Sequence, residues 1–222
     1  MINKIIILFK IARKIGSSNI IEIVDRSHKV PFFIKLFFNL VSLSFSKNQK
    51  KTGRTNDLSS AIQDLGTTFI KLGQFLATRP DIIGEELTKN LEKLQDKLPP
   101  FSKSLAENII KEELGELTSK NIIEFSDPIA AASIAQVHKA KINEGNIIKD
   151  VAIKVLRPNI KEIFNSEIDA IMMLAYLVET FIPKTKRLKL IEVVFLFKEI
   201  TNHEMDLRFE AAAANEYLEN TK

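Results

Sequence analysis

Cysteine is absent from the 222-residue chain, and histidine occurs only three times, as His28, His138 and His203. Without cysteine the chain cannot carry a thiol nucleophile, a thiolate zinc or iron–sulfur site, or a disulfide scaffold, so we expect an intracellular protein. Three histidines far apart in the sequence argue against a histidine-rich metal centre. A chain of this length buries enough surface to fold without a disulfide or a structural metal.

Long hydrophobic runs are also missing. The first uninterrupted apolar run, Ile5 to Phe9, is short, and no small-residue cleavage pattern follows it, which argues against a signal peptide. A second apolar stretch, residues 31–46, is interrupted by Lys35 and Asn39 and is shorter than the about 20 residues that a bilayer requires. It suits a helix in the headgroup region of a membrane or ordinary helix packing, and a membrane span less well. Residues 47–55 are expected to form a linker.

Acidic residues are scarce in the first 60 positions, which carry eleven Lys or Arg and three Asp or Glu. This basic segment could bind an anionic membrane surface, nucleic acid or an acidic partner, or remain a solvated flank. Nucleic acid is the least favoured target, because the aromatic residues alternate with aliphatic ones and do not suggest an exposed stacking platform. We therefore expect no nucleic-acid partner.

From Asp57 onward the apolar residues recur at helical spacing. A first stripe predicts a helix that ends before Pro80 and contains Leu58, Ile62, Leu65, Phe69, Leu72 and Leu76. A second stripe ends at Pro99 and contains Leu87, Leu91, Leu94 and Leu98. A third helix is expected from a capping box at Ser104 and Glu107 to Gly115.

The period then changes to two. Residues 134–142 and 151–156 alternate around the turn residues 143–146, which predicts a hairpin in a small antiparallel sheet. Helices are expected again from about Asn159 to Phe181 and from about Leu188 to Leu218.

Lys154 lies in the predicted second strand of this hairpin, on the same face as Ala152 and Leu156. Protein kinases use a lysine in such a V-A-I-K setting to hold nucleotide phosphates, paired with a helical glutamate. Where kinases carry a glycine-rich loop, this chain has Ala130, Ala131, Ala132, Ser133, Ile134, Ala135, Gln136 and Val137. Alanine adopts positive φ less readily than glycine, so this loop should be stiffer, with different phosphate contacts.

Five segments together resemble the UbiB family of atypical kinase-like proteins, which support ubiquinone biosynthesis. They are FIKLGQFLATRPD (69–81), LQDKLPPF (94–101), AAASIAQVHKA (130–140), VAIKVLRP (151–158) and HEMDLRFEAAAAN (203–215). A lone V-A-I-K would be weak evidence, whereas these segments occur in the order of the family.

The resemblance implies roles for six residues beside the alanine-rich segment. Lys71 and Gln74 match the family's K-x-G-Q motif, whose helix lies across the nucleotide cleft in relatives; Gly73 between them should permit close approach by a neighbour. Glu204 and Asp206 match the E-x-D motif, and Glu210 matches the glutamate that pairs with the strand lysine. If one helix carried all three acids, Glu204 would point about 120° away from Glu210, toward Lys71.

The sequence thus predicts an α+β fold: a protein-kinase-like N-lobe with a small antiparallel sheet, preceded by a family-specific helical extension. The expected division is a basic and apolar N-terminal segment (1–56), the helical extension (57–120) and a truncated N-lobe (121–222). After Asn215 no catalytic-loop aspartate and no D-F-G aspartate follow, so we expect the C-lobe to be absent from this chain.

The expected function follows from the resemblance. It is the N-terminal portion of an atypical kinase or ATPase. ATP is expected to bind between the alanine-rich segment, Lys154 and Glu210, but only if a separate chain supplies the C-lobe with the Mg²⁺ ligands. The alternative is a catalytically inactive membrane-peripheral scaffold or a truncated gene product. Expected partners are the anionic membrane and other ubiquinone-biosynthesis proteins. The expected location is the cytoplasm or the cytoplasmic face of the bacterial inner membrane, and no metal site is expected in this chain.

Overall fold

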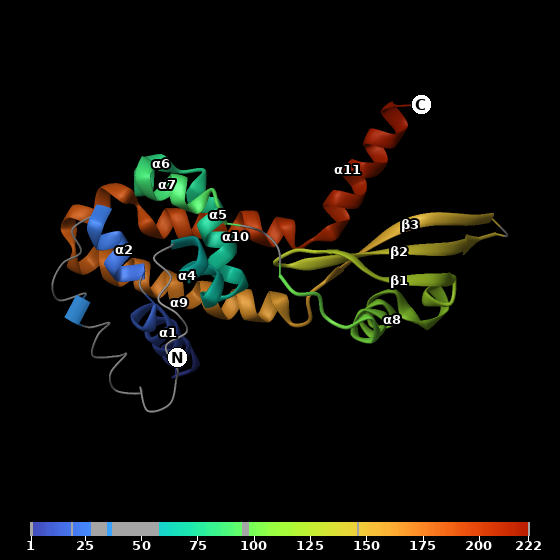
Figure 1. Cartoon of the computed structure of the whole chain (residues 1–222), viewed down its shortest axis with the longest axis horizontal. Helices are drawn as coiled ribbons and strands as arrows, with labels where there is room; N and C mark the ends of the chain where they lie inside the picture. The colour runs from blue at the N-terminus through green and yellow to red at the C-terminus, as the bar shows by residue number, and fades with distance from the viewer. Residues whose placement is uncertain are drawn as a thin grey trace. The chain divides into compact units, whose positions relative to one another are not determined.

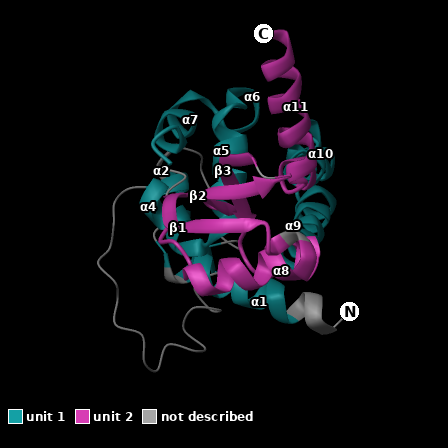
Figure 2. Ribbon diagram, turned by 90° about the vertical axis from the view of Figure 1, so that its right-hand side faces the viewer, with its two compact units in different colours: residues 1–95, 162–201 teal, residues 96–161, 202–222 magenta. Residues whose placement is uncertain are grey.

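A computed structural model describes residues 2–18, 20–27, 35–36, 58–94, 98–145 and 147–221 (Figure 1). Apart from residues 35 and 36, the apolar stretch 31–46 lies outside the described residues, as does the expected linker 47–55. The chain forms two compact units, residues 1–95 with 162–201 and residues 96–161 with 202–222 (Figure 2). The division into residues 1–56, 57–120 and 121–222 follows sequence pattern and stays a prediction.

The first unit is helical throughout its described residues. It contains α1 (Ile2–Ser17), α2 (Ile20–Ser27), α4 (Leu58–Leu65), α5 (Thr67–Ala77), α6 (Pro80–Ile83), α7 (Glu85–Leu91), most of α9 (Ile160–Phe181) and of α10 (Leu190–Glu204), and the 3-10 helix η1 (Pro183–Leu188). No helix among the described residues is both long and apolar enough to cross a membrane.

Buried apolar side chains hold these helices together. One cluster joins α1, α4, α5 and α9 through Ile11, Leu65, Phe69 and Ala170. A second joins α4 to α7 through Leu58, Leu87, Leu91 and Leu94. The ring of Phe197 in α10 lies 5.6 Å from the rings of Phe75 and Phe164, so α5, α9 and α10 also share an aromatic contact. The amphipathic stripes predicted from the sequence therefore supply this core.

The single helix predicted from Asp57 to Leu76 is wrong, because the chain breaks at Gly66 into α4 and α5. Gly66 has φ 115° and ψ −177°, a conformation that side chains disfavour. Its carbonyl accepts hydrogen bonds from the N–H groups of Phe69 and Ile70, at 3.1 and 3.0 Å, and so starts α5. Leu65 and Phe69 enter the same cluster on either side of the break, which explains why apolar spacing did not reveal it.

The next two helices also differ from the prediction at their ends. α7 ends at Leu91, well before the expected stop at Pro99. α8 (Lys103–Ser119) is capped by Ser102, whose Oγ accepts from the N–H of Leu105 at 3.4 Å, and not by Ser104. The expected end at Gly115 is an interruption with φ 78°, after which a helical turn continues to Ser119.

The second unit contains a three-stranded antiparallel sheet in the order β1-β2-β3, formed by β1 (Ile122–Ala131), β2 (Ala135–Glu144) and β3 (Ile147–Leu156). The β2–β3 hairpin confirms the prediction; its register runs without a shift from Ala135 opposite Leu156 to Glu144 opposite Ile147. α8 packs on the sheet through Ala106 and Ile110, which cluster with Val155. The α+β class, with a small kinase-like antiparallel sheet and additional helices, is confirmed.

The predicted helix from Leu188 to Leu218 is likewise two helices. α10 ends at Glu204, and α11 (Leu207–Asn220) begins after Asp206, whose φ of −95° and ψ of 90° are not helical. Met205, between the two helices, is buried at 2% exposure and anchors the break. The angle expected between Glu204 and Glu210 on one continuous helix is therefore wrong.

Candidate functional site

The two faces of the sheet have different characters. Paired residues on antiparallel strands share a face, so Gln136 with Val155 and His138 with Ile153 lie on one face. Val155 and Ile153 pack with α8, which covers that face. Val137 with Lys154, Lys139 with Ala152 and Lys141 with Asp150 lie on the opposite face. Lys154 is thus on the face opposite α8, and it shares that face with Ala152, as the alternation predicted.

Lys154 contacts Glu210 of α11. Its Nζ donates a hydrogen bond to Oε2 of Glu210 at 2.6 Å, across a sequence separation of 56 residues. The side chains are 34% and 61% exposed, so solvent screens their attraction. Pairs of this kind stabilise proteins by about 0.2 to 1 kcal/mol. The contact therefore contributes little to folding, and its main effect is to hold an ammonium group in one place on an open sheet face.

Asp206 controls where α11 begins. Its Oδ1 accepts hydrogen bonds from the backbone N–H of Arg208, at 3.2 Å, and from Nε of Arg208, at 2.8 Å. The side-chain hydrogen bond from Arg208 lowers the pKa of Asp206 to about 2, because it favours the ionised carboxylate. Asp206 is thus the N-cap of the helix that carries Glu210.

The alanine-rich segment forms the connection between β1 and β2. Ala130 and Ala131 end β1, residues 132–134 turn, and residues 135–137 begin β2. The N–H of Ala132 donates to the carbonyl of Ala135 at 2.8 Å and closes the turn. Among the described residues, positive φ occurs outside glycine only at Asn159 and Lys189, so no alanine here takes a glycine-like conformation. Ser133, Ile134 and Ala135 are buried.

Gln136 is also buried, and its side chain bonds other parts of the second unit. Its Oε1 accepts from the N–H of Phe101 at 2.9 Å, and its Nε2 donates to the carbonyl of Phe101 at 3.2 Å. The same Nε2 lies 2.9 Å from Nε2 of His138, whose Nδ1 lies 2.9 Å from the carbonyl of Ser126. This network is consistent with a neutral His138 that carries its proton on Nδ1. Gln136, predicted as a nucleotide contact, has no exposed surface.

Arg157 is a residue of the site that the sequence patterns did not single out. It directly follows β3 and contacts the alanine-rich turn: its Nε and Nη2 donate to the carbonyl of Ala132 at 3.0 and 2.8 Å. Its Nη2 also donates to the carbonyl of Pro99 at 3.0 Å. The carbonyls of Ala132 and Pro99 are main-chain acceptors, which a sequence pattern cannot reveal.

The K-x-G-Q residues lie in α5 of the other compact unit. Lys71 and Gln74 are half-buried and one turn apart. Gly73 is buried, and a Cβ at this position would collide with Cδ1 of Leu94, which confirms that the glycine permits a close approach. Lys154, Glu204, Asp206 and Glu210 belong to the second unit. A contact between Lys71 and Glu204, and the placement of α5 over the cleft, stay predictions.

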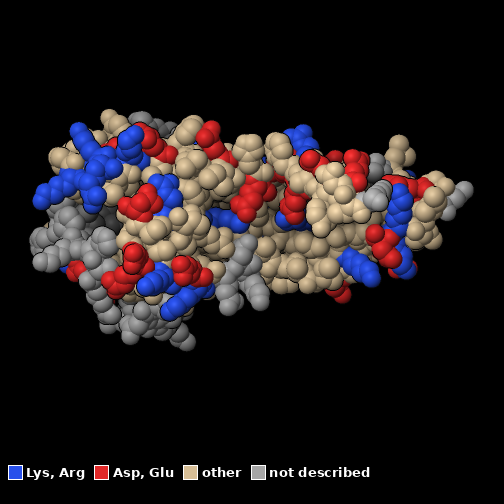
Figure 3. Space-filling view, turned by 90° about the horizontal axis from the view of Figure 1, so that it is seen from above, with Lys and Arg blue, Asp and Glu red and all other residues tan. Residues whose placement is uncertain are grey.

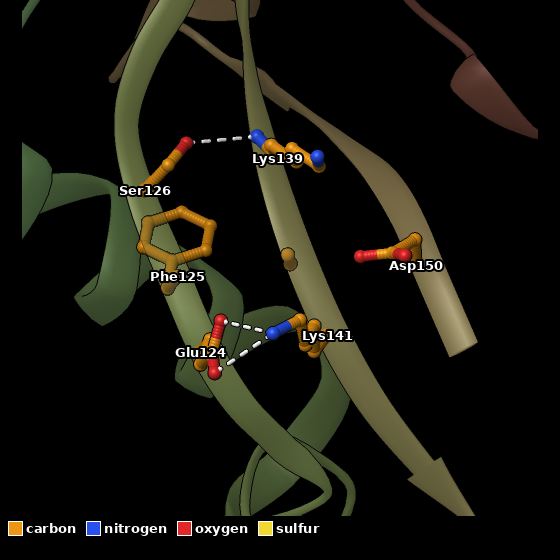
Figure 4. A pocket seen from close by; sticks show the side chains of 7 residues that line it. Glu124, Phe125, Ser126, Lys139, Lys141 and Asp150 are labelled. Carbon is orange, nitrogen blue, oxygen red and sulfur yellow. Dashed lines mark hydrogen bonds and ion pairs between the residues drawn. The ribbon is translucent and has the colours of Figure 1, made fainter. Parts of the chain in front are cut away.

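A shallow hollow of about 500 Å³ lies on the sheet near Phe125 (Figure 4). Lys141 forms an ion pair there with Glu124 at 2.9 Å, and this hydrogen bond raises the pKa of Lys141. Lys149 and Glu144 form an ion pair at 2.5 Å near the end of the hairpin. Figure 3 shows positive and negative side chains interspersed on this part of the surface. The hollow is lined by none of the predicted site residues, so the ion pair of Lys154 defines the candidate site.

In the part of the chain that the structure describes, no group of three or more His, Asp or Glu side chains is arranged to hold a metal ion. Among the predicted acids, Asp206 has both carboxylate oxygens hydrogen-bonded to Arg208. The candidate site consists of one positioned cation, its carboxylate partner and a closed turn.

Comparison with known proteins identifies similar chains. A family model described as the ABC1 atypical kinase-like domain matches residues 93–222. The chain is 37% identical over 193 residues to "Probable protein kinase UbiB" of Marinobacter nauticus, covering 86% of this chain and 35% of that protein. It is 34% identical over 215 residues to the protein of the same name from Pseudomonas aeruginosa, covering 96% and 40%. The chain therefore spans less than half the length of these relatives.

Titration of Asp206 tests its side-chain hydrogen bond with Arg208. The pKa of this carboxyl in the folded chain is about 2, below the ordinary aspartate value of about 3.9, so the ionised form stabilises the fold above about pH 4. That stabilisation is lost as the pH falls toward 2. We expect the carboxyl ¹³C signal of Asp206 to titrate with a midpoint near 2. Arg208→Gln should raise the midpoint toward the ordinary range, because it removes the largest cause of the shift, whereas Arg187→Gln should not change it; a wild-type midpoint near 4 contradicts the side-chain bond between Arg208 and Asp206.

Proposed function

The chain belongs to the ABC1 atypical kinase-like family, in which UbiB proteins are its relatives, and from this membership we propose that it forms the N-terminal part of an ATP-dependent kinase or ATPase that supports ubiquinone biosynthesis. The observation that carries the proposal is the 2.6 Å contact between Lys154 and Glu210. It matches the pairing of a strand lysine with a helical glutamate that phosphoryl-transfer enzymes of the kinase type require.

Lys154 is suited to holding phosphate oxygens. Its ammonium group is a compact point charge with three donors, of which Glu210 accepts one, and about a third of its side chain faces solvent. Glu210 orients the ammonium without burying it. Lys154 can therefore bind an anionic ligand, while Glu210 keeps the ammonium group at a fixed position on β3. ATP, when bound, supplies the phosphoryl group.

The surroundings of Lys154 suit the rest of a nucleotide. Val137 lies opposite Lys154 on β2, and Ala152 lies two residues before it on the same face. Small apolar side chains of this kind suit contact with the base of a nucleotide. The closed Ala132–Ala135 turn lies at the end of the sheet where Ala135 of β2 pairs with Leu156 of β3, two residues from Lys154 along β3.

We propose that Mg²⁺ and the catalytic aspartate come from a C-lobe outside these 222 residues. The carboxylate of Asp206 is hydrogen-bonded to Arg208, and that of Glu210 is ion-paired with Lys154, so neither is available as a Mg²⁺ ligand in this arrangement. Further proposed partners are other proteins of ubiquinone biosynthesis. The proposed location is peripheral, at the cytoplasmic face of the inner membrane.

Covalent labelling of Lys154 tests this proposal. An acyl phosphate of ATP transfers its acyl group to an amine that lies beside the bound phosphates. With the C-terminal part of the Marinobacter nauticus relative added as the C-lobe, we expect Lys154 to be acylated and excess ATP to suppress the reaction. Mass spectrometry of the peptides measures both.

Lys149 provides the matched control, because it lies on the same strand and is also ion-paired, with Glu144. Its labelling should not respond to ATP. Lys154→Ala should abolish ATP-sensitive labelling and lower the free energy of unfolding by no more than about 1 kcal/mol. The chain on its own should hydrolyse no ATP. ATP-insensitive acylation of Lys154 in the presence of the added lobe would contradict the proposal.

Helix α1 favours a second candidate function, a membrane-peripheral scaffold without catalysis. Ile6 and Phe9 on this helix are 47% and 41% exposed, and the neighbouring Lys10 and Arg13 are exposed as well. These four positions have the i, i+3, i+4, i+7 spacing of one helix face. Exposed apolar groups beside cations are typical of helices that bind the headgroup region of anionic membranes.

Flotation with vesicles that contain phosphatidylglycerol tests this candidate. Deleting the N-terminal segment would be a poor test, because Ile11 of α1 is part of the core. We expect the double variant Ile6→Ser, Phe9→Ser to lose most vesicle binding. The matched variant Ile123→Ser, Ile129→Ser, which also removes exposed apolar side chains, should bind as the wild type does. Equal flotation of both variants would exclude α1 as the contact.

A further inference from the structure

Arg157 connects three parts of the second unit. Its guanidinium donates to the carbonyl of Ala132 in the turn and to that of Pro99, 58 residues away in sequence. Its backbone N–H donates to the carbonyl of Ile134 at 2.8 Å. The guanidinium carbon lies 6.0 Å from the centre of the Phe101 ring. One residue thus bonds both sides of the Ala132–Ala135 turn and the Pro99–Phe101 segment.

We propose that Arg157 is a positioning residue that holds the Ala132–Ala135 turn closed, so that a nucleotide meets a rigid, preformed turn and not a loop that folds over its phosphates. Only this last step, from the turn to the nucleotide, rests on the proposed function. Neither the K-x-G-Q helix nor the pair of Lys154 and Glu210 takes part in the contacts by which Arg157 holds the turn.

The chemistry of the contacts requires arginine. Nε and Nη2 of a planar guanidinium point in fixed directions, and here both reach the same carbonyl oxygen while Nη2 also reaches Pro99. A lysine ammonium also has several donors, but they are not fixed in direction and lysine has no counterpart of the Nε donor, so it reproduces only part of these contacts. Glutamine, which is shorter and uncharged, cannot replace the fork. The two substitutions therefore weaken the contact to different degrees.

A second, independent contact makes the anchor firm. Gln136, next to the turn on β2, exchanges two hydrogen bonds with the main chain of Phe101. The segment that Arg157 holds is consequently fixed from two sides. Because Ser133, Ile134 and Ala135 are buried, the turn opens only if this contact with Pro99–Phe101 loosens.

Amide hydrogen exchange of the 222-residue chain tests the turn directly and needs no nucleotide. In Arg157→Gln, a peptide covering residues 130–137 should exchange faster by about tenfold, since local opening follows the loss of these hydrogen bonds. Arg157→Lys should give an intermediate rate. Peptides from α8 should exchange as in the wild type, and the matched charge change Arg187→Gln should alter neither region.

Unchanged exchange of residues 130–137 in Arg157→Gln would overturn the proposal, as would an equal acceleration in α8 and β3, which would indicate general destabilisation. If Arg157→Gln does not fold, Arg157→Lys decides between the same outcomes.

The nucleotide step has its own readout. With the added lobe, Arg157→Gln should require several-fold more ATP than the wild type to suppress acylation of Lys154. The amount of AMP required should not change, because AMP lacks the β- and γ-phosphates that are proposed to reach the turn. Arg157→Lys should restore part of the ATP response. Equal shifts for ATP and AMP would overturn this step. If ATP does not compete even in the wild type, the proposed function fails, whereas the exchange result still decides whether Arg157 holds the turn.

Discussion

The ion pair between Lys154 and Glu210 is the constraint on which the candidate site depends. It joins a strand to a helix across 56 residues, yet both side chains remain partly exposed, so it contributes little to folding energy. Its position follows from two stronger local features: the shift-free register of β2 with β3, and the Asp206 cap that starts α11. Stability is supplied elsewhere, by the apolar face under α8, which leaves the cation free to bind a ligand.

The closed turn gives the site a different character from a glycine-rich loop. Alanine prevents the glycine-like backbone conformations, and burial of Ser133, Ile134 and Ala135 removes the freedom to fold outward. Arg157 and Gln136 then attach the turn to Pro99–Phe101. For the proposed function, the fixed cation and the fixed turn would form a preorganised site, because a rigid site loses less conformational entropy on binding than a mobile loop does.

Short-range patterns and the family resemblance predicted the hairpin, the face of Lys154 and its contact with Glu210. The helix break at Gly66 was missed, because buried apolar residues on both sides of it preserve the helical spacing. The break at Met205–Asp206 was missed for another reason: it is set by the hydrogen bond of the Asp206 cap, which apolar spacing does not signal, and α11 has no buried residue. Gln136 was predicted as a nucleotide contact, but its amide bonds the main chain of Phe101. Arg157 was missed, since it contacts carbonyl oxygens 25 and 58 residues away, and such contacts leave no signal in the sequence.

The lysine ammonium region of a ¹H–¹⁵N NMR spectrum tests the central contact most directly. An ammonium held against a carboxylate exchanges its protons slowly enough to give a separate signal, and removing the charge of its partner moves that signal. The account predicts that Glu210→Gln shifts or broadens the Nζ signal of Lys154, whereas Glu144→Gln, which removes the partner of Lys149 on the same strand, leaves it in place. A Lys154 signal that does not respond to Glu210→Gln would contradict it.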